Sequence, residues 1–389
     1  MVWPLRAGRE SRLQKGNPDG SRCTGIGLGK MGISHQAILN STSGIELVAT
    51  CDSTPLVASV MGRYTKARSY SDYAEMLAKE PLDAVVIATP PKAHVPMVEA
   101  AIAKGLAIFC EKPFVLETAD GIALAEAAEA AGIVNQVGYH YRFVGSFVHV
   151  KSLVDAGILG RIHHVTAEAY GPVVLRPKTG SWRGSKQTGG GALYDYATHA
   201  LDLLNYCVGR PDTVLSASLG SVFSEEVDDE VYALMGYDDG MTATLQVNWS
   251  DESYRKMSTK LTLYGTKGKI IADRQEVQVY MREPRPDLGL NQGWNVRYTT
   301  ELTEPVDYYL RGEEYSAQIE HFARHVAAGD KATRSTFATA VEADMTVDAI
   351  RAAATRDAIR IDDGEMVAAS TQTRARPRTG LARLFGKSQ

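Results

Sequence analysis

A glycine-rich turn near the start of the chain constrains the fold more than any other stretch. The pattern is G-x-G-x-x-G, and its residues are Gly27, Leu28, Gly29, Lys30, Met31 and Gly32. An apolar run at residues 23–26 precedes the turn, and apolar residues recur at helical spacing over residues 33–39. The order strand, glycine turn and helix is typical of a dinucleotide-binding βαβ unit. A tight turn that binds no ligand would show the same glycines, so the residues that follow must distinguish a dinucleotide site from a purely structural turn.

An acidic residue follows at the distance that a dinucleotide fold requires. Residues 46–51 predict a second strand, and Asp52 ends it about 20 residues beyond the last glycine. In that interpretation the start of the helix binds the diphosphate, and Asp52 accepts hydrogen bonds from ribose hydroxyls. An acid there repels a 2′-phosphate and Ser53 supplies no cation, so we expect NAD(H). Arg63 and Lys66 lie close enough in sequence to leave NADP(H) open.

Strand and helix patterns alternate through the first third of the chain. Continuous apolar runs at residues 83–88 and 106–110 predict strands that are covered on both faces, and residues 94–104 and 117–131 predict helices. This alternation predicts an α/β fold, a doubly wound Rossmann domain at residues 23–143. Ligands of such sheets bind beyond the carboxyl ends of the strands. The expected cofactor-binding residues at these ends are Thr89, Pro90, His94, Glu111 and Lys112.

The pattern changes after about residue 144. Residues 231–237 and 241–249 alternate apolar and polar side chains around a turn at Asp238-Asp239-Gly240, which predicts an antiparallel hairpin. We therefore expect an α+β domain at residues 144–362, with a large, mostly antiparallel sheet. A disordered basic arm and a basic flexible tail are expected on either side of the two domains, at residues 1–22 and 363–389.

Composition narrows the functional class. The 389 residues carry a formal net charge of −4, which argues against nucleic acid as a partner. No apolar run approaches the ~18 residues of a membrane-spanning helix. The four cysteines are scattered and lack metal-ligand spacing, so we expect buried thiols in the cytoplasm and no metal site.

A second motif carries candidate catalytic residues. Three consecutive glycines, residues 189–191, precede a predicted helix in which Asp195 and His199 lie four residues apart and share one face. A carboxylate beside an imidazole holds its tautomer and raises its basicity, which suits a general base acting on an alcohol. A structural pair would show the same spacing. Lys112 stands between Glu111 and Pro113 at the expected ligand edge, where its ammonium group could polarise a substrate oxygen.

Together, the glycine turn, Thr89-Pro90, His94, Glu111-Lys112-Pro113 and the GG…D-x-x-x-H run resemble the glucose–fructose oxidoreductase / inositol dehydrogenase / rhizopine catabolism (Gfo/Idh/MocA) family. The resemblance implies a Rossmann domain, a second domain whose open sheet face makes a homodimer or homotetramer, and a final helix that packs back on the first domain. It also implies that Lys112, Asp195 and His199 line the active site, with His199 as the acid/base. Pro91 and Ala197 depart from the family pattern without removing a catalytic group.

The substrate is less constrained. Further pocket candidates are Tyr139, His140, Tyr141, Arg142, Lys178, Trp182, Arg183, Tyr254 and Arg255. The substrate site is expected to combine Tyr141, Arg142, Trp182 and Arg183 with the two motif residues Asp195 and His199. Aromatic rings suit a sugar face and cations suit a phosphate.

Three functions stay open. The first is an NAD(P)-dependent dehydrogenase or reductase acting on a secondary hydroxyl of a sugar, cyclitol or related polyol. The second is a ketoreductase or dehydrogenase of nucleotide sugars in a biosynthetic pathway. The third is a regulator that holds a dinucleotide without turnover, against which the presence of Lys112, Asp195 and His199 together argues.

Overall fold

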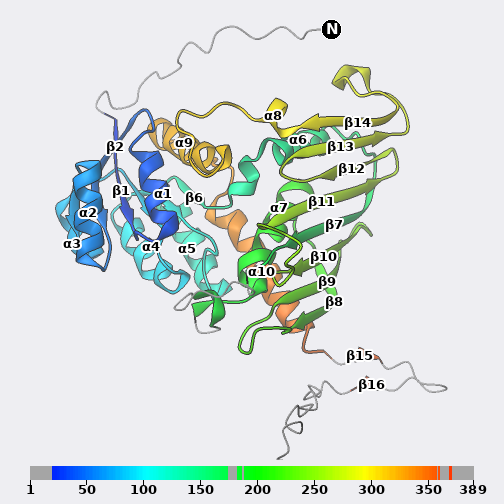
Figure 1. Cartoon of the computed structure of the whole chain (residues 1–389), viewed down its shortest axis with the longest axis horizontal. Coiled ribbons are helices and arrows are strands. Elements are labelled where there is room, and N and C mark those ends of the chain that lie inside the picture. The colour runs from blue at the N-terminus through cyan, green and yellow to red at the C-terminus, as the bar shows by residue number, and fades with distance from the viewer. Residues whose placement is uncertain (1–19, 174–181, 186–187, 357, 360–367, 370–389) are drawn as a thin grey trace, which may run out of the picture.

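The computed structural model describes residues 20–173, 182–185, 188–356, 358–359 and 368–369 (Figure 1). The expected basic arm and tail lie almost wholly outside these residues, as does the pocket candidate Lys178. The first strand begins at Ser21, and the last described pairing joins residues 358–359 to 368–369.

Six parallel strands form the first sheet, in the order β3-β2-β1-β4-β5-β6. They are β1 (Ser21–Ile26), β2 (Ile45–Cys51), β3 (Arg68–Tyr70), β4 (Ala84–Ile87), β5 (Ala107–Cys110) and β6 (Asn135–Val137). The connecting helices are α1 (Lys30–Leu39), α2 (Pro55–Thr65), α3 (Tyr73–Lys79), η1 (Pro91–Ala93), α4 (His94–Ala103) and α5 (Thr118–Ala131). The strand order reverses between β1 and β4, and a doubly wound sheet binds ligands at such a reversal. The predicted α/β fold is confirmed.

The burial pattern of β4 shows why this sheet reads as continuous apolar runs. Val85 and Ile87 belong to a core that also contains residues of α3, α4 and α5. Ala84 and Val86 belong to a second core, on the opposite face, with residues of α1 and α9. Alternate side chains of a strand point to opposite faces, so helices on both sides bury every residue of β4.

The second sheet has eight strands in the order β14-β13-β12-β11-β7-β10-β9-β8. They are β7 (Ile162–Tyr170), β8 (Thr213–Gly220), β9 (Glu230–Gly236), β10 (Thr242–Asn248), β11 (Ser258–Gly265), β12 (Gly268–Ala272), β13 (Glu276–Met281) and β14 (Gly293–Tyr298). All neighbours pair antiparallel except β7 and β10, which pair in parallel. The predicted α+β domain with a mostly antiparallel sheet is therefore confirmed.

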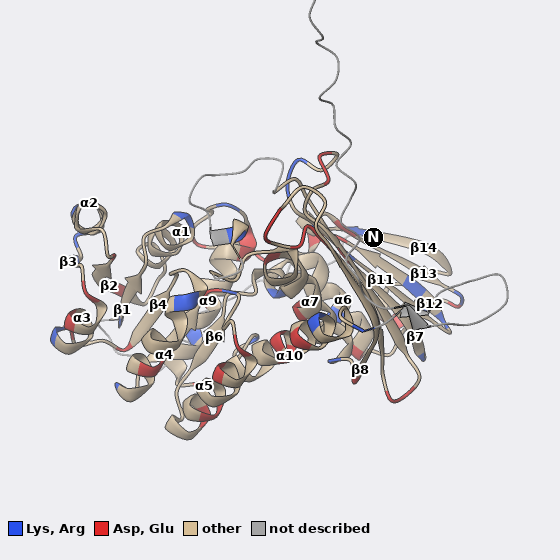
Figure 2. Ribbon diagram, turned by 90° about the horizontal axis from the view of Figure 1, so that it is seen from below, with Lys and Arg blue, Asp and Glu red and all other residues tan. Residues whose placement is uncertain are grey.

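Helices cover the second sheet on the side that faces the first domain (Figure 2). They are α6 (Gly145–Asp155), α7 (Thr198–Val208) and α10 (Phe337–Ala353), and short η2 (His140–Phe143), η3 (Trp182–Gly184), η5 (Leu193–Ala197), η6 (Pro286–Leu288) and α8 (Thr299–Leu302) fill the connections. Figure 2 also shows acidic and basic positions interspersed over the ribbon of the described residues.

Two late helices connect the domains. Helix α9 (Glu313–Ala328) packs on α1 and on η2, whereas α10 lies along α5 and extends to α7 and β8. At the start of α10 the Phe337 ring stacks on Phe114 at 4.4 Å, and its backbone N–H donates to Asn135 of β6. These contacts hold the carboxyl edge of the first sheet against the helical layer of the second. Within the described ranges, no helix is long and apolar enough to cross a membrane.

Candidate active site

The glycine turn between β1 and α1 leaves open space where a ligand would lie. Gly27 has φ +89°, and a Cβ there would sit 2.7 Å from the carbonyl oxygen of Ala88. A Cβ on Gly32 would sit 1.8 Å from the carbonyl oxygen of Gly27, so the fold itself requires both glycines. A Cβ on Gly29 would meet nothing within 4 Å. Its lack of a side chain therefore serves no packing contact and leaves the first turn of α1, which starts with Lys30 and Met31, open to a diphosphate.

Asp52 follows β2 at the same edge of the sheet. Its carboxylate accepts hydrogen bonds from the backbone N–H groups of Leu28, at 2.7 Å, and Thr54, at 2.8 Å. These bonds join the acid to the glycine turn, with Ser53 exposed beside it. The chemistry and position fit recognition of ribose hydroxyls, and we conclude that this edge of the sheet fits an NAD molecule.

His94 lies beneath this edge and joins two of its loops. The ring is buried, with Nε2 3.0 Å from the Thr89 carbonyl oxygen and Nδ1 3.0 Å from that of Phe114. Burial lowers the pKa of His94, because a charged imidazole would be desolvated there. His94 therefore positions the Thr89-Pro90 loop. A direct contact between its ring and the cofactor stays a prediction.

Glu111 has a partner that the sequence analysis missed. Its Oε1 lies 2.5 Å from Nε2 of His35 on α1, and its Oε2 accepts the backbone N–H of Lys112 at 3.1 Å. Burial alone would raise the pKa of Glu111, yet the hydrogen bond to His35 and the nearby charge of Lys112 hold it below its ordinary value. The carboxylate therefore fixes the start of the Lys112-Pro113 turn, whose peptide bond is cis.

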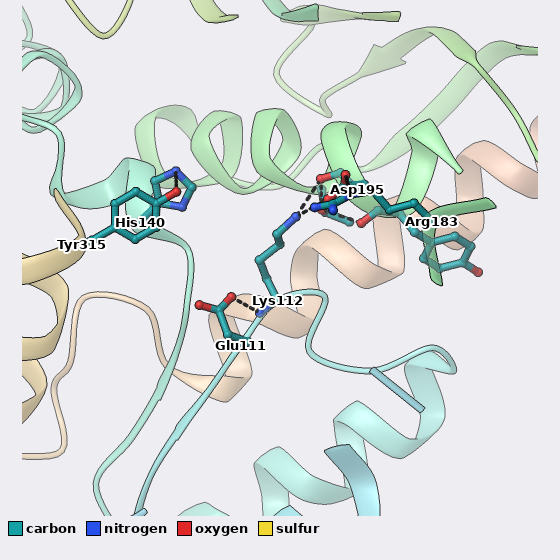
Figure 3. Close-up of polar contacts among 8 residues, drawn as sticks. Glu111, Lys112, His140, Arg183, Asp195 and Tyr315 are labelled. Atoms are coloured by element: carbon teal, nitrogen blue, oxygen red, sulfur yellow. Dashed lines mark hydrogen bonds and ion pairs between the residues drawn. The ribbon is translucent and has the colours of Figure 1, made fainter. Parts of the chain in front are cut away.

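Lys112 reaches across from the end of β5 to the second domain (Figure 3). Its Nζ lies 2.6 Å from Oδ1 of Asp195 and 3.1 Å from the Asp195 carbonyl oxygen. The other carboxylate oxygen, Oδ2, accepts Nε–H of Arg183 at 2.6 Å. Burial would raise the pKa of Asp195, but the two cations outweigh it and lower the pKa to about 2. One ionised carboxylate thus orients both cations at the junction of the domains.

His199 differs from the expectation that Asp195 would hold its tautomer. Both Asp195 carboxylate oxygens are engaged by the two cations, and Nδ1 of His199 is buried without a hydrogen-bond partner in the described structure. Burial, followed by the charges of Lys112, His140 and Arg183, lowers the pKa of His199 well below its ordinary value. The expected rise in basicity is therefore wrong, because the carboxylate was already committed elsewhere.

Aromatic rings surround His199 instead. Tyr141 and His140 contact it edge-to-face at centroid distances of 5.2 Å and 4.8 Å, and Tyr139 contacts it at 6.0 Å. Tyr315, on α9, stacks on His140 at 4.6 Å. The sequence analysis missed Tyr315, because it lies far along the chain from every recognised motif. The site therefore offers apolar ring faces close to Lys112 and His199.

A π-helical turn places Asp195 and His199. Helix η5 (Leu193–Ala197) precedes α7, and such turns occur frequently at functional sites. Asp228, which lies just before β9, stabilises this turn because its carboxylate accepts the backbone N–H of Leu193 at 2.6 Å. Gly191 has φ +117°, and a Cβ there would collide with the Asp228 carboxylate. The close approach of Asp228 therefore explains the glycine at position 191.

The structure gives the remaining substrate candidates different surroundings. Arg142 is buried and pairs with Asp202 through Nε and Nη2, while its Nη1 donates to the carbonyl oxygen of Arg334 at 2.7 Å. This corrects its predicted substrate contact, because its donors already have partners. Of Trp182, only the backbone in η3 is described. Tyr254 stacks on Tyr170 of β7 at 5.4 Å.

Arg255 follows Tyr254 and is exposed. No contact of the described residues joins either of them to the site. Among the residues with described positions, no cluster of three or more His, Cys, Asp or Glu side chains could hold a metal ion.

Known proteins match both halves of the chain. Residues 22–139 match the family model described as "Oxidoreductase family, NAD-binding Rossmann fold", and residues 147–271 match the model "GFO/IDH/MocA C-terminal domain". The rhizopine catabolism protein MocA of Rhizobium meliloti is 31% identical over 189 residues, which are 48% of this chain and 57% of that protein.

Two further similarities extend over more of the chain. Inositol 2-dehydrogenase of Rhizobium meliloti (strain 1021) is 25% identical over 311 residues, which are 76% of this chain and 89% of that protein. Levoglucosan dehydrogenase, solved in complex with NADH and levoglucosan, superposes with a TM-score of 0.76 at 24% identity. That alignment covers 86% of this chain and 97% of the other, and it shows a common fold.

Proposed function

The chain belongs to the Gfo/Idh/MocA family of NAD-binding oxidoreductases, and from this premise we propose that it interconverts a secondary alcohol and a ketone on a sugar, cyclitol or related polyol. One observation carries the proposal. The Lys112 ammonium group, held 2.6 Å from Asp195, lies beside the uncharged His199 where the two domains meet. The names of the relatives, an inositol dehydrogenase and a levoglucosan dehydrogenase, agree with this substrate class.

Residues at the edge of the first sheet would hold the cofactor. The open Gly29 position and the first turn of α1 suit the diphosphate, and Asp52 suits the ribose hydroxyls. Asp52 favours NAD over NADP, because its negative charge repels a 2′-phosphate. NAD, when bound, supplies the acceptor or donor for the hydride.

The proton is handled by His199 and Lys112. Since burial and neighbouring cations keep His199 neutral near pH 7, its imidazole can accept the hydroxyl proton of the substrate. Loss of that proton leaves negative charge on the oxygen, and the Lys112 ammonium group stabilises this charge until the carbonyl has formed. In the reverse direction the same two groups return the proton to the oxygen. Asp195 orients Lys112 throughout.

We also propose that the protein forms a homodimer or homotetramer through the open face of its second sheet, and that it acts in the cytoplasm. Tyr280 and Trp294 lie opposite each other on that face, 40% and 54% exposed. Val296 and Tyr298, on alternate positions of β14, are 45% and 52% exposed. An apolar row of this kind suits burial by a second copy. All four cysteines are buried free thiols, as a reducing compartment would keep them.

The proposal is tested by following NADH formation with NAD⁺, and separately NADP⁺, over a panel of free sugars, cyclitols and nucleotide sugars. His199→Ala is assayed alongside, with cofactor affinity measured by fluorescence titration. We expect turnover on one class, an NAD preference, and loss of turnover in the variant with cofactor binding retained. Cofactor binding without turnover on any substrate would favour the regulatory alternative, and equal turnover by His199→Ala would remove His199 from the mechanism.

A further inference from the structure

A stack of rings leads outward from His199 along one side of the site. His140 contacts His199 edge-to-face at 4.8 Å and stacks on Tyr315 at 4.6 Å with 19° between the ring planes. Figure 3 shows Tyr315 and His140 stacked on one side of the Lys112 side chain, with Arg183 on the other. The guanidinium carbon of Arg311 lies 5.4 Å from the centroid of the Tyr315 ring. Arg311 therefore forms the outer end of a stack whose inner end is the catalytic imidazole.

Arg311 differs from the other cations near the site. Lys112 and Arg183 share the carboxylate of Asp195, and Arg274 pairs with Glu314. Arg311 is exposed, and no carboxylate among the residues with described positions forms an ion pair with it. Its charge nevertheless reaches the site, since it contributes, after burial and nearer cations, to the lowered pKa of His140.

The backbone of Arg311 is held in an unfavourable conformation. Its φ is +66°, in the left-handed region that side chains other than glycine rarely adopt. The second non-glycine residue with positive φ among those described, Lys66, follows α2 as an ordinary helix C-cap. Arg311 instead precedes Gly312, which caps the start of α9. A glycine would fit at position 311 without strain, so the guanidinium group itself is the feature that needs an explanation.

The loop that carries Arg311 is fixed to α9, so the position of this cation is defined. The backbone N–H of Asp307 donates to the Glu320 carboxylate at 2.9 Å, and the carbonyl oxygen of Tyr308 accepts the hydroxyl of Ser316. Leu310 packs against the apolar core beneath α9. These anchors hold the backbone that carries Arg311 before any ligand arrives, which reduces the entropic cost of ordering the loop on binding.

We propose that Arg311 binds an anionic group of the substrate, a carboxylate or a phosphate, at the end remote from the carbon that is oxidised. The inference rests on the proposed function and refines its substrate class from neutral polyols to sugars or polyols with an acidic substituent. The planar guanidinium group of Arg311, whose central carbon lies over the Tyr315 ring, carries its N–H donors in the fork that matches carboxylate or phosphate oxygens. The ring faces of Tyr315 and His140 suit the apolar faces of the sugar between the two ends.

The test uses Arg311→Asn, because asparagine tolerates a positive φ and removes the charge without straining the loop. Arg311→Lys keeps the charge, and Arg210→Asn, which removes an exposed arginine just beyond the C-terminal end of α7, is the matched control. Glucose, glucuronate, glucose 6-phosphate and UDP-glucose are titrated into the NADH-loaded proteins by calorimetry, and the same sugars are assayed for NAD⁺ reduction. Comparison of these four compounds separates carboxylate, phosphate and diphosphate as the recognised group.

We expect the wild type to bind one of the acidic sugars at least tenfold more tightly than glucose, and Arg311→Asn to lose that preference. For a turned-over sugar, KM should rise about tenfold while kcat changes less than threefold, and Arg311→Lys should recover part of the affinity. Thermal stability of Arg311→Asn should equal or exceed that of the wild type.

Equal binding of acidic and neutral sugars by the wild type, or no binding of any acidic sugar, would overturn the inference. A weaker affinity of Arg311→Asn for NADH with unchanged sugar binding would also overturn it, assigning the cation to the cofactor diphosphate. Because binding is read in the NADH-loaded protein without turnover, these results stay separate from the failure of the proposed function. That failure would show as retained sugar binding with no NADH formed on any substrate.

Discussion

Two buried carboxylates that lie seven positions apart in the sequence show how differently ion pairs can serve a protein. Asp202, on α7, pairs with Arg142, and Asp195, in the π-helical turn just before α7, pairs with Lys112 and Arg183. Both carboxylates are buried. Yet burial raises the pKa of Asp202 despite its single cation, whereas the two cations at Asp195 lower its pKa to about 2.

The difference lies in what surrounds the cations. The Arg142 side chain is 4% exposed and uses its donors on Asp202 and a backbone carbonyl, so it has nothing to offer a ligand. The Lys112 and Arg183 side chains are 12% and 43% exposed, and both meet one carboxylate. We call the Arg142–Asp202 contact the closed pair, and a buried pair of this kind supports the fold. We call Asp195 with its two partly exposed cations the open pair, and such an arrangement supports a site where charge develops on a ligand.

The largest effect is expected when the open pair loses its amine. Lys112→Met should reduce kcat by about 10³-fold, because it removes the ammonium group proposed to stabilise charge on the substrate oxygen. The dissociation constant for NAD should change less than threefold, as measured by fluorescence titration. Lys151→Met, which breaks an exposed pair with Asp155, is the matched control and should leave kcat unchanged. Retained turnover in Lys112→Met would show that the open pair is structural as well.

The closed pair should respond in stability. Arg142→Met leaves the Asp202 carboxylate buried without a counter-ion, and should lower the free energy of unfolding by about 3–5 kcal/mol in urea denaturation. Replacing both partners, as Arg142→Met with Asp202→Leu, should recover most of that loss. If the double variant is as unstable as the single one, the pair contributes more than charge compensation.

Acid sensitivity should separate the pairs further. Since the pKa of Asp195 falls from 3.8 to about 2 on folding, its contribution to stability is complete above pH 4 and is lost between about pH 4 and pH 2. The size of the effect is about 2 kcal/mol. Unfolding free energies measured at several pH values should fall less steeply through this window in Asp195→Asn than in the wild type. Parallel curves would contradict the assignment of the low pKa to Asp195.

The smallest effect concerns Arg183. Its charge is one cause of the lowered pKa of His199, so Arg183→Gln should raise that pKa. The acidic limb of the kcat/KM profile should then move to higher pH, from a wild-type position below pH 6.5. Arg210→Gln, which alters an exposed residue just beyond the C-terminal end of α7, should leave the limb in place. No movement in Arg183→Gln would mean that the limb reports another group.

Local patterns predicted most of the fold. The glycine turn, the apolar run of β4 and the hairpin turn at Asp238-Asp239-Gly240 each depend on contacts that are close in sequence, and the structure confirms the two domain types they indicated. The predicted start of one strand was wrong, because a hydrogen bond to the preceding helix excludes its first residue from the strand. The strand expected at residues 106–110 begins at Ala107, because the N–H of Leu106 still bonds to the carbonyl oxygen of Ala101 near the end of α4.

The site was predicted only in part, because its partners come from distant segments. Lys112 and Asp195 were recognised, but their contact spans 83 positions and could not be inferred from spacing. Arg142 was assigned to the substrate because its partner Asp202 lies 60 positions away. Tyr315 belongs to no motif, and only the packing of α9 on η2 brings it to His140.

The most direct test of the account compares Asp195→Asn with Asp202→Asn, two changes of equal size on neighbouring turns. For each variant, kcat is measured on the best substrate of the panel, and the free energy of unfolding is measured at pH 7. Asp195→Asn should lose at least 10²-fold in kcat with a stability loss of about 2 kcal/mol, because solvent can reach its partly exposed cations. Asp202→Asn should lose about 3 kcal/mol or more, with kcat of the folded protein within threefold of the wild type. The same loss of turnover in both variants, or the reverse pattern, would contradict the division into a catalytic and a structural pair.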